Sequence, residues 1–157
     1  VCGYSPRQRL DVIVNILTNF AVNKGAIRVF GGTQKRPNIH IEDMAELYLF
    51  LLQKDDEAID GQIYNAGYEN HTVMQLAEMV KNVVGDDLAI NVEPTDDPRS
   101  YKVSSEKIKT QLGFTPTHSI EDAVFDLVAA MKDGRLTNTM EDPRYFNIKL
   151  MHDTDLK

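Results

Sequence analysis

Two arginines lie beside residues that form turns, and both could bind an anion. Arg36 follows the glycine pair Gly31-Gly32, and Arg99 lies in a polar loop after a proline. A guanidinium group presents a planar fork of N–H donors that matches phosphate, and backbone without Cβ atoms lets an anion approach closely. The pattern favours a phosphate site near Arg36, with an ordinary strand-helix unit as the alternative. Arg99 could serve that site, or it could balance Asp96 and Asp97 at the surface.

Phe30 and Asn15 are two further residues that could contact a ligand. Phe30 directly precedes the glycines, where an aromatic ring either belongs to the core or stacks on a flat base, and the sequence leaves both readings open. Asn15, Asn19 and Asn23 recur every four residues on one face of an expected helix. Such a row is either a solvated stripe or a set that faces a ligand. Asn15 is the member that lies among apolar neighbours.

Apolar periodicity and capping residues predict the elements that would position these side chains. The expected helices cover 8–24, 43–52, 72–84, 104–112 and 119–131, and the expected strands cover 26–30, 39–41, 61–67 and 88–92. Asp43 is the expected N-cap of the second helix, and Thr72 and Gln75 form a capping box at the third. The strand, helix and strand between 39 and 67 have short links, which is typical of a parallel crossover. The last stretch, 135–157, shows no clear periodicity.

Composition excludes several classes of function. The net charge of −7 and the pI near 5.0 argue against a nucleic-acid-binding surface. No apolar run is long enough to span a membrane and no signal-peptide pattern opens the chain, so we expect a cytoplasmic protein without a membrane partner. The single cysteine, Cys2, can form no internal disulfide, and the four histidines show no zinc-binding spacing. We therefore expect no metal site.

The first residues look like the end of a strand that runs into a turn. The chain begins at Val1 rather than at a methionine, although its 157 residues are enough for one domain. A lone strand cannot satisfy its backbone N–H and C=O groups, so its sheet should contain strands that this sequence lacks. We expect a fragment of a longer protein.

Six short motifs occur in an order that resembles a known family. They are Val1–Arg7, Val29–Gly32, Arg36–Asp43, Ile63–Gly67, Arg99–Ser104 and Leu112–Pro116. Together they resemble the carboxyl-terminal half of the extended short-chain dehydrogenase/reductase family, and within it the NAD-dependent nucleotide-sugar epimerases and dehydratases. The resemblance implies an α/β fold, in which 1–157 is the C-terminal portion of the enzyme. About 39–68 would contribute to a Rossmann-type NAD(P)-binding sheet, and about 5–38 and 69–150 would form a small α+β substrate-binding lobe.

The resemblance also implies roles for particular residues. Asn15 resembles the helix residue that touches the diphosphate of the substrate, and Arg36 and Arg99 match two arginines that face the phosphates or ribose from opposite sides. The wall of the nucleobase pocket corresponds to Val29 and Phe30. The turn that passes the nicotinamide end of the cofactor corresponds to Gly3, Tyr4 and Ser5.

Two departures from the family pattern limit what this sequence could do alone. It has no glycine-rich phosphate loop after a first strand, and no tyrosine followed four residues later by lysine at the family's position. Tyr145 and Lys149 have that spacing, but they lie in the tail, and we interpret them as chance. We therefore expect no catalytic residue and no cofactor bound by this fragment alone.

The expected function is the substrate-binding portion of a longer isomerase, lyase or oxidoreductase that uses NAD or NADP. Its expected partners are a nucleoside diphosphate sugar, the missing N-terminal half and a second copy in a homodimer. Two other classes stay open. One is a non-catalytic module that binds a nucleotide or sugar phosphate, and the other is a structural or interaction domain without a ligand.

Overall fold

Two small sheets lie among the helices of this computed structural model, which describes residues 1–97 and 99–154. The strands are β1 (Ala26–Phe30), β2 (Lys35–Asn38), β3 (Glu69–Thr72) and β4 (Ala89–Glu93). The helices are α1 (Ile13–Lys24), α2 (Ile41–Leu51), α3 (Asp56–Ile59), α4 (Val73–Val84), α5 (Glu106–Leu112), α6 (Ile120–Lys132), the 3₁₀ helix η1 (Pro143–Tyr145) and α7 (Asn147–Asp153). Strand β1 pairs with β4 in parallel, and β2 pairs with β3 in antiparallel.

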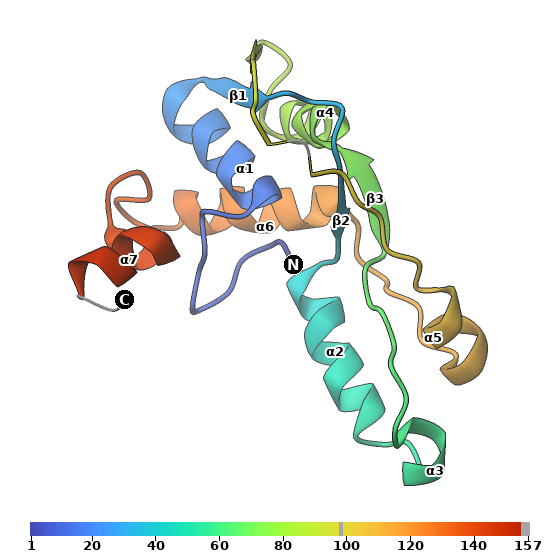
Figure 1. Cartoon of the computed structure of the whole chain (residues 1–157). Coiled ribbons are helices and arrows are strands. Elements are labelled where there is room, and N and C mark those ends of the chain that lie inside the picture. Colours follow the sequence, from blue (N-terminus) through green and yellow to red (C-terminus); the bar gives the residue numbers. More distant parts are fainter. Residues whose placement is uncertain (98, 155–157) are drawn as a thin grey trace.

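Helices α1, α4 and α6 pack together beside β1 and enclose the main hydrophobic core (Figure 1). The apolar stripe of each helix faces this core because residues three and four apart share one helix face. Its fully or almost fully buried members include Val14, Leu17, Ile27, Val29, Leu76, Val80, Ile120 and Val124. Helices α2 and α5 extend away from it and share a smaller cluster of Leu47, Ile108 and Phe114.

Several boundaries follow the capping signals of the sequence. Thr72 and Gln75 form the expected capping box at α4, and a box of Ser119 and Asp122 begins α6. Gly25 ends α1 with φ 63°, a left-handed conformation that glycine adopts without strain. The α/β class predicted from the sequence is confirmed.

The start of α2 differs from the prediction. The N-cap is His40, whose Nδ1 accepts the backbone N–H of Glu42 at 3.2 Å, so the helix begins at Ile41 and Asp43 lies inside its first turn. Residues 39–41 are therefore not a strand. Their only ladder contact in the described chain is a single parallel bridge between Cys2 and His40. The predicted cap was wrong because the ring nitrogen of His40 accepts a backbone N–H at the start of α2, a role that the carboxylate of Asp43 was expected to play.

The predicted strand 61–67 does not form, and with it the predicted crossover between 39 and 67 is absent. The segment has no strand neighbour among the described residues, and Ile63 is 81% exposed. Gly67 donates its backbone N–H to Ser105 Oγ at 2.9 Å instead of to a strand. The parallel pair is β1 with β4, joined by a much longer connection than the one predicted.

Helix α1 begins at Ile13 rather than at Gln8. The side chain of Gln8 accepts the backbone N–H of Ser5 at 3.0 Å and donates to the carbonyl of Gly3 at 3.3 Å. These hydrogen bonds hold the first residues in a turn, and the backbone of Val12 is extended (φ −109°, ψ 152°), so no helix runs from Gln8 into α1. The N-terminal turn is therefore an element of its own.

Asp43 joins α2 to the start of α6. Its buried carboxylate accepts the backbone N–H groups of Thr117 at 2.9 Å and His118 at 3.1 Å, and it contacts His118 Nδ1 at 2.9 Å. Burial acts to raise the pKa of Asp43, but the hydrogen bonds from Thr117 and His118 outweigh it and lower the pKa below its usual range. The hydrogen bond to Asp43 in turn raises the pKa of His118.

We expect Asp43→Ala to lower the free energy of unfolding by about 3 kcal/mol or more. The change leaves two backbone N–H groups without their acceptor and opens a small cavity at the joint. Urea or thermal unfolding measures the loss. Glu46→Ala, which removes an exposed carboxylate from the same helix, is the matched control and should change stability little. Equal losses in both variants would contradict the role of Asp43.

The ion pair of His118 with Asp43 predicts a stability that depends on pH. Because the pKa of His118 is raised on folding, its contribution is fully present below the usual histidine value of about 6.5 and is lost as the pH rises through the raised pKa. The contribution of Asp43, whose pKa is lowered, is lost only as the pH falls through that lowered pKa.

Between about pH 6 and pH 9 the melting temperature of the natural chain should therefore fall more than that of His118→Asn, which cannot titrate there. Thermal unfolding across this range measures the difference. If the melting temperatures of the two proteins change in parallel with pH, the pair makes no pH-dependent contribution to stability.

Candidate functional site

The two predicted arginines lie next to each other around one carboxylate, that of Asp97. Arg99 binds it with two N–H groups, at 2.7 Å from Nε to Oδ1 and 2.8 Å from Nη2 to Oδ2. Arg36 approaches the same carboxylate from β2, at 3.4 Å from Nη2 to Oδ2. Arg36 also donates to the backbone carbonyl of Arg99, 63 residues further along the chain. The structure thus brings both guanidinium groups to one anion position.

Hydrogen bonds between β2 and the loop that contains Arg99 create this arrangement. Lys35 donates its backbone N–H to Ser100 Oγ at 3.0 Å, and Tyr101 returns a backbone hydrogen bond to Lys35 at 3.3 Å. The ring of Tyr101 lies under the guanidinium of Arg36, 5.3 Å from carbon to centroid. The side chain of Arg36 is 16% exposed and that of Arg99 78% exposed. Arg36 is the fixed member of the pair, and Arg99 lies at the surface.

Arg36 borders two hollows. One, of about 180 Å³, has Phe30, Gln34 and Asp97 in its lining. The other, of about 230 Å³, lies toward Tyr101 and the start of α1. The hydrogen bonds from Arg99 lower the pKa of Asp97 to about 2, so its carboxylate carries a full negative charge at neutral pH. Asp97 was not among the predicted site residues. The sequence offered it only as a surface partner of Arg99, and that ion pair forms.

Phe30 lies beside this site and is not a core residue. Its side chain is 45% exposed, and the Arg28 guanidinium lies over its ring at 4.7 Å. Arg28 is held by Glu93 through two hydrogen bonds of 2.6 Å. The neighbouring Val29 is fully buried in the main core. Of the two residues predicted for a base pocket, only Phe30 presents its side chain to a hollow.

The glycine corner holds a residue that the sequence reading missed. Gly31 and Gly32 both have positive φ, 76° and 116°, which side chains rarely tolerate. Gln34 folds back into the corner, accepting the Gly32 N–H at 2.6 Å and donating to the carbonyl of Phe30 at 2.8 Å. Gly31 makes room for the amide of Gln34, since a Cβ at Gly31 would lie 2.8 Å from Gln34 Nε2. The position of Gln34 two residues after Gly32 was the only signal in the sequence.

Asn15 lies in the first turn of α1, where it bonds to the N-terminal turn and lines neither of the two hollows that Arg36 borders. It is buried, its Oδ1 accepts the N–H of Gly3 at 3.2 Å, and its Nδ2 donates to the carbonyl of Arg9 at 2.8 Å. A hollow of about 230 Å³ is lined by Gly3, Ser5 and Asn15 among others. Tyr4 lines a different hollow, with Arg135 4.5 Å from its ring centroid.

The other two asparagines of the row contact the chain itself. The amide of Asn19 donates to the carbonyl of Thr139 at 2.9 Å, and Asn23 donates to Asn19 and to the hydroxyl of Thr139. Asn19 is almost fully buried. The row is therefore no solvated stripe, because it attaches the segment after α6 to α1.

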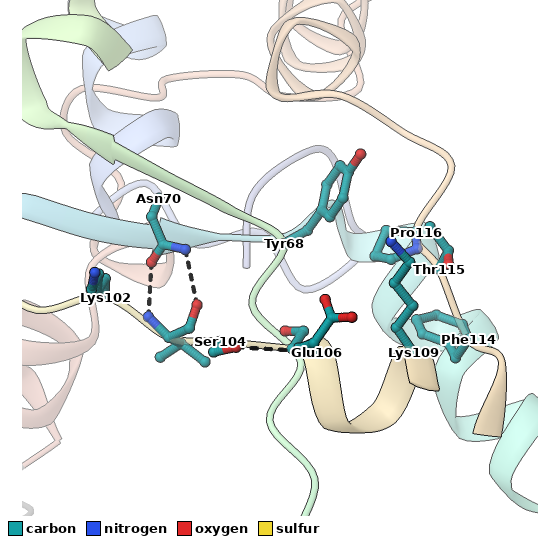
Figure 2. Close-up of a pocket in the computed structure, with 11 residues that line it drawn as sticks. Tyr68, Asn70, Lys102, Ser104, Glu106, Lys109, Phe114, Thr115 and Pro116 are labelled. Atoms are coloured by element: carbon teal, nitrogen blue, oxygen red, sulfur yellow. Dashed lines mark hydrogen bonds between the residues drawn. The ribbon is translucent and has the colours of Figure 1, made fainter. Parts of the chain in front are cut away.

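A hollow larger than the two that Arg36 borders contains none of the predicted site residues. It has a volume of about 540 Å³ and lies between the segment at Tyr68 and helix α5, with Glu106, Lys109 and Phe114 in its lining (Figure 2). Along one side, the amide of Asn70 exchanges two hydrogen bonds with the backbone of Val103, at 2.9 and 2.8 Å. Size alone does not mark this hollow as the site, because its charged side chains are exposed and do not converge.

His40, Glu42 and His118 are close enough to raise the question of a metal site. The two rings are stacked, with centroids 4.7 Å apart and planes at 21°, so their nitrogen lone pairs cannot both point at one ion. His40 Nε2 is buried 3.3 Å from Asp126 Oδ2 and has no hydrogen bond in the described chain. We assign no metal to this cluster.

Comparison with known proteins places the chain in a family. Residues 1–67 match the NAD dependent epimerase/dehydratase family. A UDP-glucose 4-epimerase of Corynebacterium glutamicum is 37% identical over 100 residues, which cover 59% of this chain and 30% of that protein. UDP-glucuronic acid decarboxylase 1 of Arabidopsis thaliana is 30% identical over 144 residues, which cover 88% of this chain and 32% of that protein. The chain belongs to the NAD-dependent epimerase/dehydratase family.

Solved structures agree with this assignment. The UDP-glucose 4-epimerase of Thermotoga maritima with UDP-glucose matches at a TM-score of 0.70 and 25% identity, over 86% of this chain and 45% of that one. The UDP-glucuronic acid 4-epimerase of Bacillus cereus with UDP-glucuronic acid and NAD matches in fold at a TM-score of 0.70, over 84% and 43%. This epimerase/dehydratase chain spans about a third of the length of the curated relatives above and less than half of these solved chains. Within the described residues, no helix is long and apolar enough to cross a bilayer.

Within this family member, the hydrogen bonds of Asn15 predict a loss of stability on mutation. Asn15→Ala leaves the buried N–H of Gly3 without its acceptor, so we expect the free energy of unfolding to fall by about 1–3 kcal/mol. Asn91→Ala, on the exposed face of β4, is the control. Chemical denaturation measures both, and equal stability of the two variants would argue that Asn15 has no structural role.

Proposed function

We propose that this chain is the part of an NAD(P)-dependent nucleotide-sugar epimerase or dehydratase that grips the diphosphate of the substrate. The convergence of Arg36 and Arg99 on one carboxylate is the observation that carries the proposal. Two guanidinium groups can neutralise a diphosphate and direct several N–H donors to its oxygens. A single surface arginine would supply neither the charge nor the geometry.

The surroundings of the pair support a nucleotide as the rest of the ligand. Phe30 lies on the hollow that Arg36 borders, and its ring offers a face for a base. Relatives with solved structures are described in complex with UDP-glucose and with UDP-glucuronic acid. We therefore propose a nucleoside diphosphate sugar as the substrate. Epimerisation, dehydration and reduction all remain compatible with it, because the residues that differ between them are not in this chain.

The residues present could border only one end of the cofactor, its nicotinamide end. NAD or NADP would accept and return hydride when bound, but the chain has no glycine-rich loop to hold a pyrophosphate. The turn of Gly3 and Ser5 lines a hollow that the nicotinamide end could border. A side chain at Gly3, where φ is 102°, would approach His40 Nε2 to 3.1 Å, so the turn depends on glycine. We propose that the cofactor loop and the tyrosine and lysine of the chemistry belong to the N-terminal half of a longer protein.

Removing either arginine should weaken binding of the nucleotide sugar. For Arg36→Ala and for Arg99→Ala we expect a loss of about 1–3 kcal/mol in binding free energy, which is the usual cost of one hydrogen bond to a charged group. Lys24→Ala, which removes an exposed positive charge at the end of α1, is the matched control. Saturation-transfer NMR with UDP-glucose measures binding by this chain, and the same variants in a longer protein report through turnover.

The result also separates the alternatives. The proposal expects weak binding by this chain alone, because only part of the pocket is present. Tight binding without a further half would favour a free-standing nucleotide-binding module. Binding and turnover that survive both arginine substitutions would favour an interaction domain. The homodimer and the cytoplasmic location stay predictions.

A further inference from the structure

We propose that Asp97 is an internal competitor of the substrate, whose carboxylate takes the place of a phosphate group between Arg36 and Arg99 until the diphosphate displaces it. The inference rests on the proposed function and concerns the same site. It assigns to Asp97 an effect on substrate affinity that is opposite to that of the two arginines.

The contacts of Asp97 are those expected of a bound anion. Both of its carboxylate oxygens accept N–H donors of Arg99, at 2.7 and 2.8 Å, in the paired geometry that guanidinium groups also adopt with phosphate. Arg36 reaches one of the same oxygens at 3.4 Å. The carboxylate lies on the hollow that Phe30 and Arg36 share, where the proposed ligand would bind.

The local chain holds Asp97 in this position. Its backbone N–H donates to Thr95 Oγ1 at 3.2 Å, and its Oδ1 accepts the backbone N–H of Arg99 at 3.1 Å. Such a turn closed by a side chain fixes the carboxylate relative to the backbone. The contact with Arg99 is therefore built into the loop and does not depend on a chance surface rotamer.

The energetics favour displacement over permanent closure. The Asp97 side chain is 34% exposed and that of Arg99 is 78% exposed, and ion pairs at such surfaces contribute little because water screens them. A diphosphate carries more charge and more acceptor oxygens than one carboxylate, so it can replace Asp97 at both arginines. Asp97 then remains nearby as a negative charge that repels the ligand. The net effect of Asp97 is to lower affinity.

The variant Asp97→Asn isolates the charge, because asparagine retains an Oδ1 that can accept the Arg99 N–H. Asp96→Asn is the matched control. It changes the net charge by the same amount one residue away, and Asp96 makes no ion pair in the part of the chain that the structure describes. Titration of each protein with UDP-glucose and with inorganic pyrophosphate, followed by NMR at low and high salt, gives the dissociation constants.

We expect Asp97→Asn to bind both probes about threefold to tenfold more tightly, with a gain that shrinks at high salt. Asp96→Asn should change affinity less than about twofold, since its charge is farther from the site and screened. Unchanged or weaker binding by Asp97→Asn would overturn the inference and make Asp97 a residue that positions the arginines.

The outcome is distinguishable from failure of the proposed function. If the natural chain binds and Arg36→Ala weakens it, while Asp97→Asn gives no gain, only the present inference fails. If no variant binds either probe, both proposals fail. Melting temperatures of the three proteins confirm that each is folded in the titration.

Discussion

The attachment of one loop to the small antiparallel sheet is the constraint on which the candidate site depends. The amide of Asn70 on β3 holds the backbone of Val103 through two hydrogen bonds, and Lys35 on β2 holds Ser100 and Tyr101. Because the two strands are paired, the loop is fixed to both at once. Arg99 reaches Arg36 only through this attachment. Without it, the arginines would be separate surface charges on an acidic protein.

A second contact between distant parts of the chain attaches helix α2 to the start of α6. Helix α2 leaves the core, and besides the backbone bridge between Cys2 and His40 the carboxylate of Asp43 attaches it by binding the residues just before α6. A buried carboxylate is stable there because several N–H donors replace the water it lost. The same charge stabilises the protonated form of His118. The joint is therefore both structural and sensitive to pH.

The site carries two positive charges, whereas the chain as a whole is negatively charged. The net charge is −7, and a substrate with a diphosphate would be repelled at long range. Local geometry overcomes this at short range, because two guanidinium groups converge and one of them is held by backbone carbonyls and by the ring of Tyr101. Asp97 neutralises part of that charge in the free protein. Membership of the epimerase/dehydratase family supports the proposal that this arrangement binds the diphosphate of a nucleotide sugar.

The sequence by itself determined the local elements whose signals lie within a few residues. The capping box at Thr72 and the strand 26–30 are where the patterns placed them, because a cap is satisfied by its immediate neighbours. The α/β class and the family followed from the order of such elements and motifs. Arg36 and Arg99 could be named, and the expectation that they share one site came from the family resemblance and not from a local pattern.

Only the tertiary structure decided which distant groups meet. The segment 61–67 reads as a strand, yet a strand needs a neighbour to take its backbone hydrogen bonds, and the described residues provide none. Asp43 reads as a cap, yet its carboxylate bonds to residues more than 70 positions away. Asp97 reads as a surface partner of its neighbour Arg99, and that ion pair forms, but its second contact is with Arg36, which comes from a separate element. Hydrogen bonds across such distances depend on how the elements pack, and no local pattern contains that information.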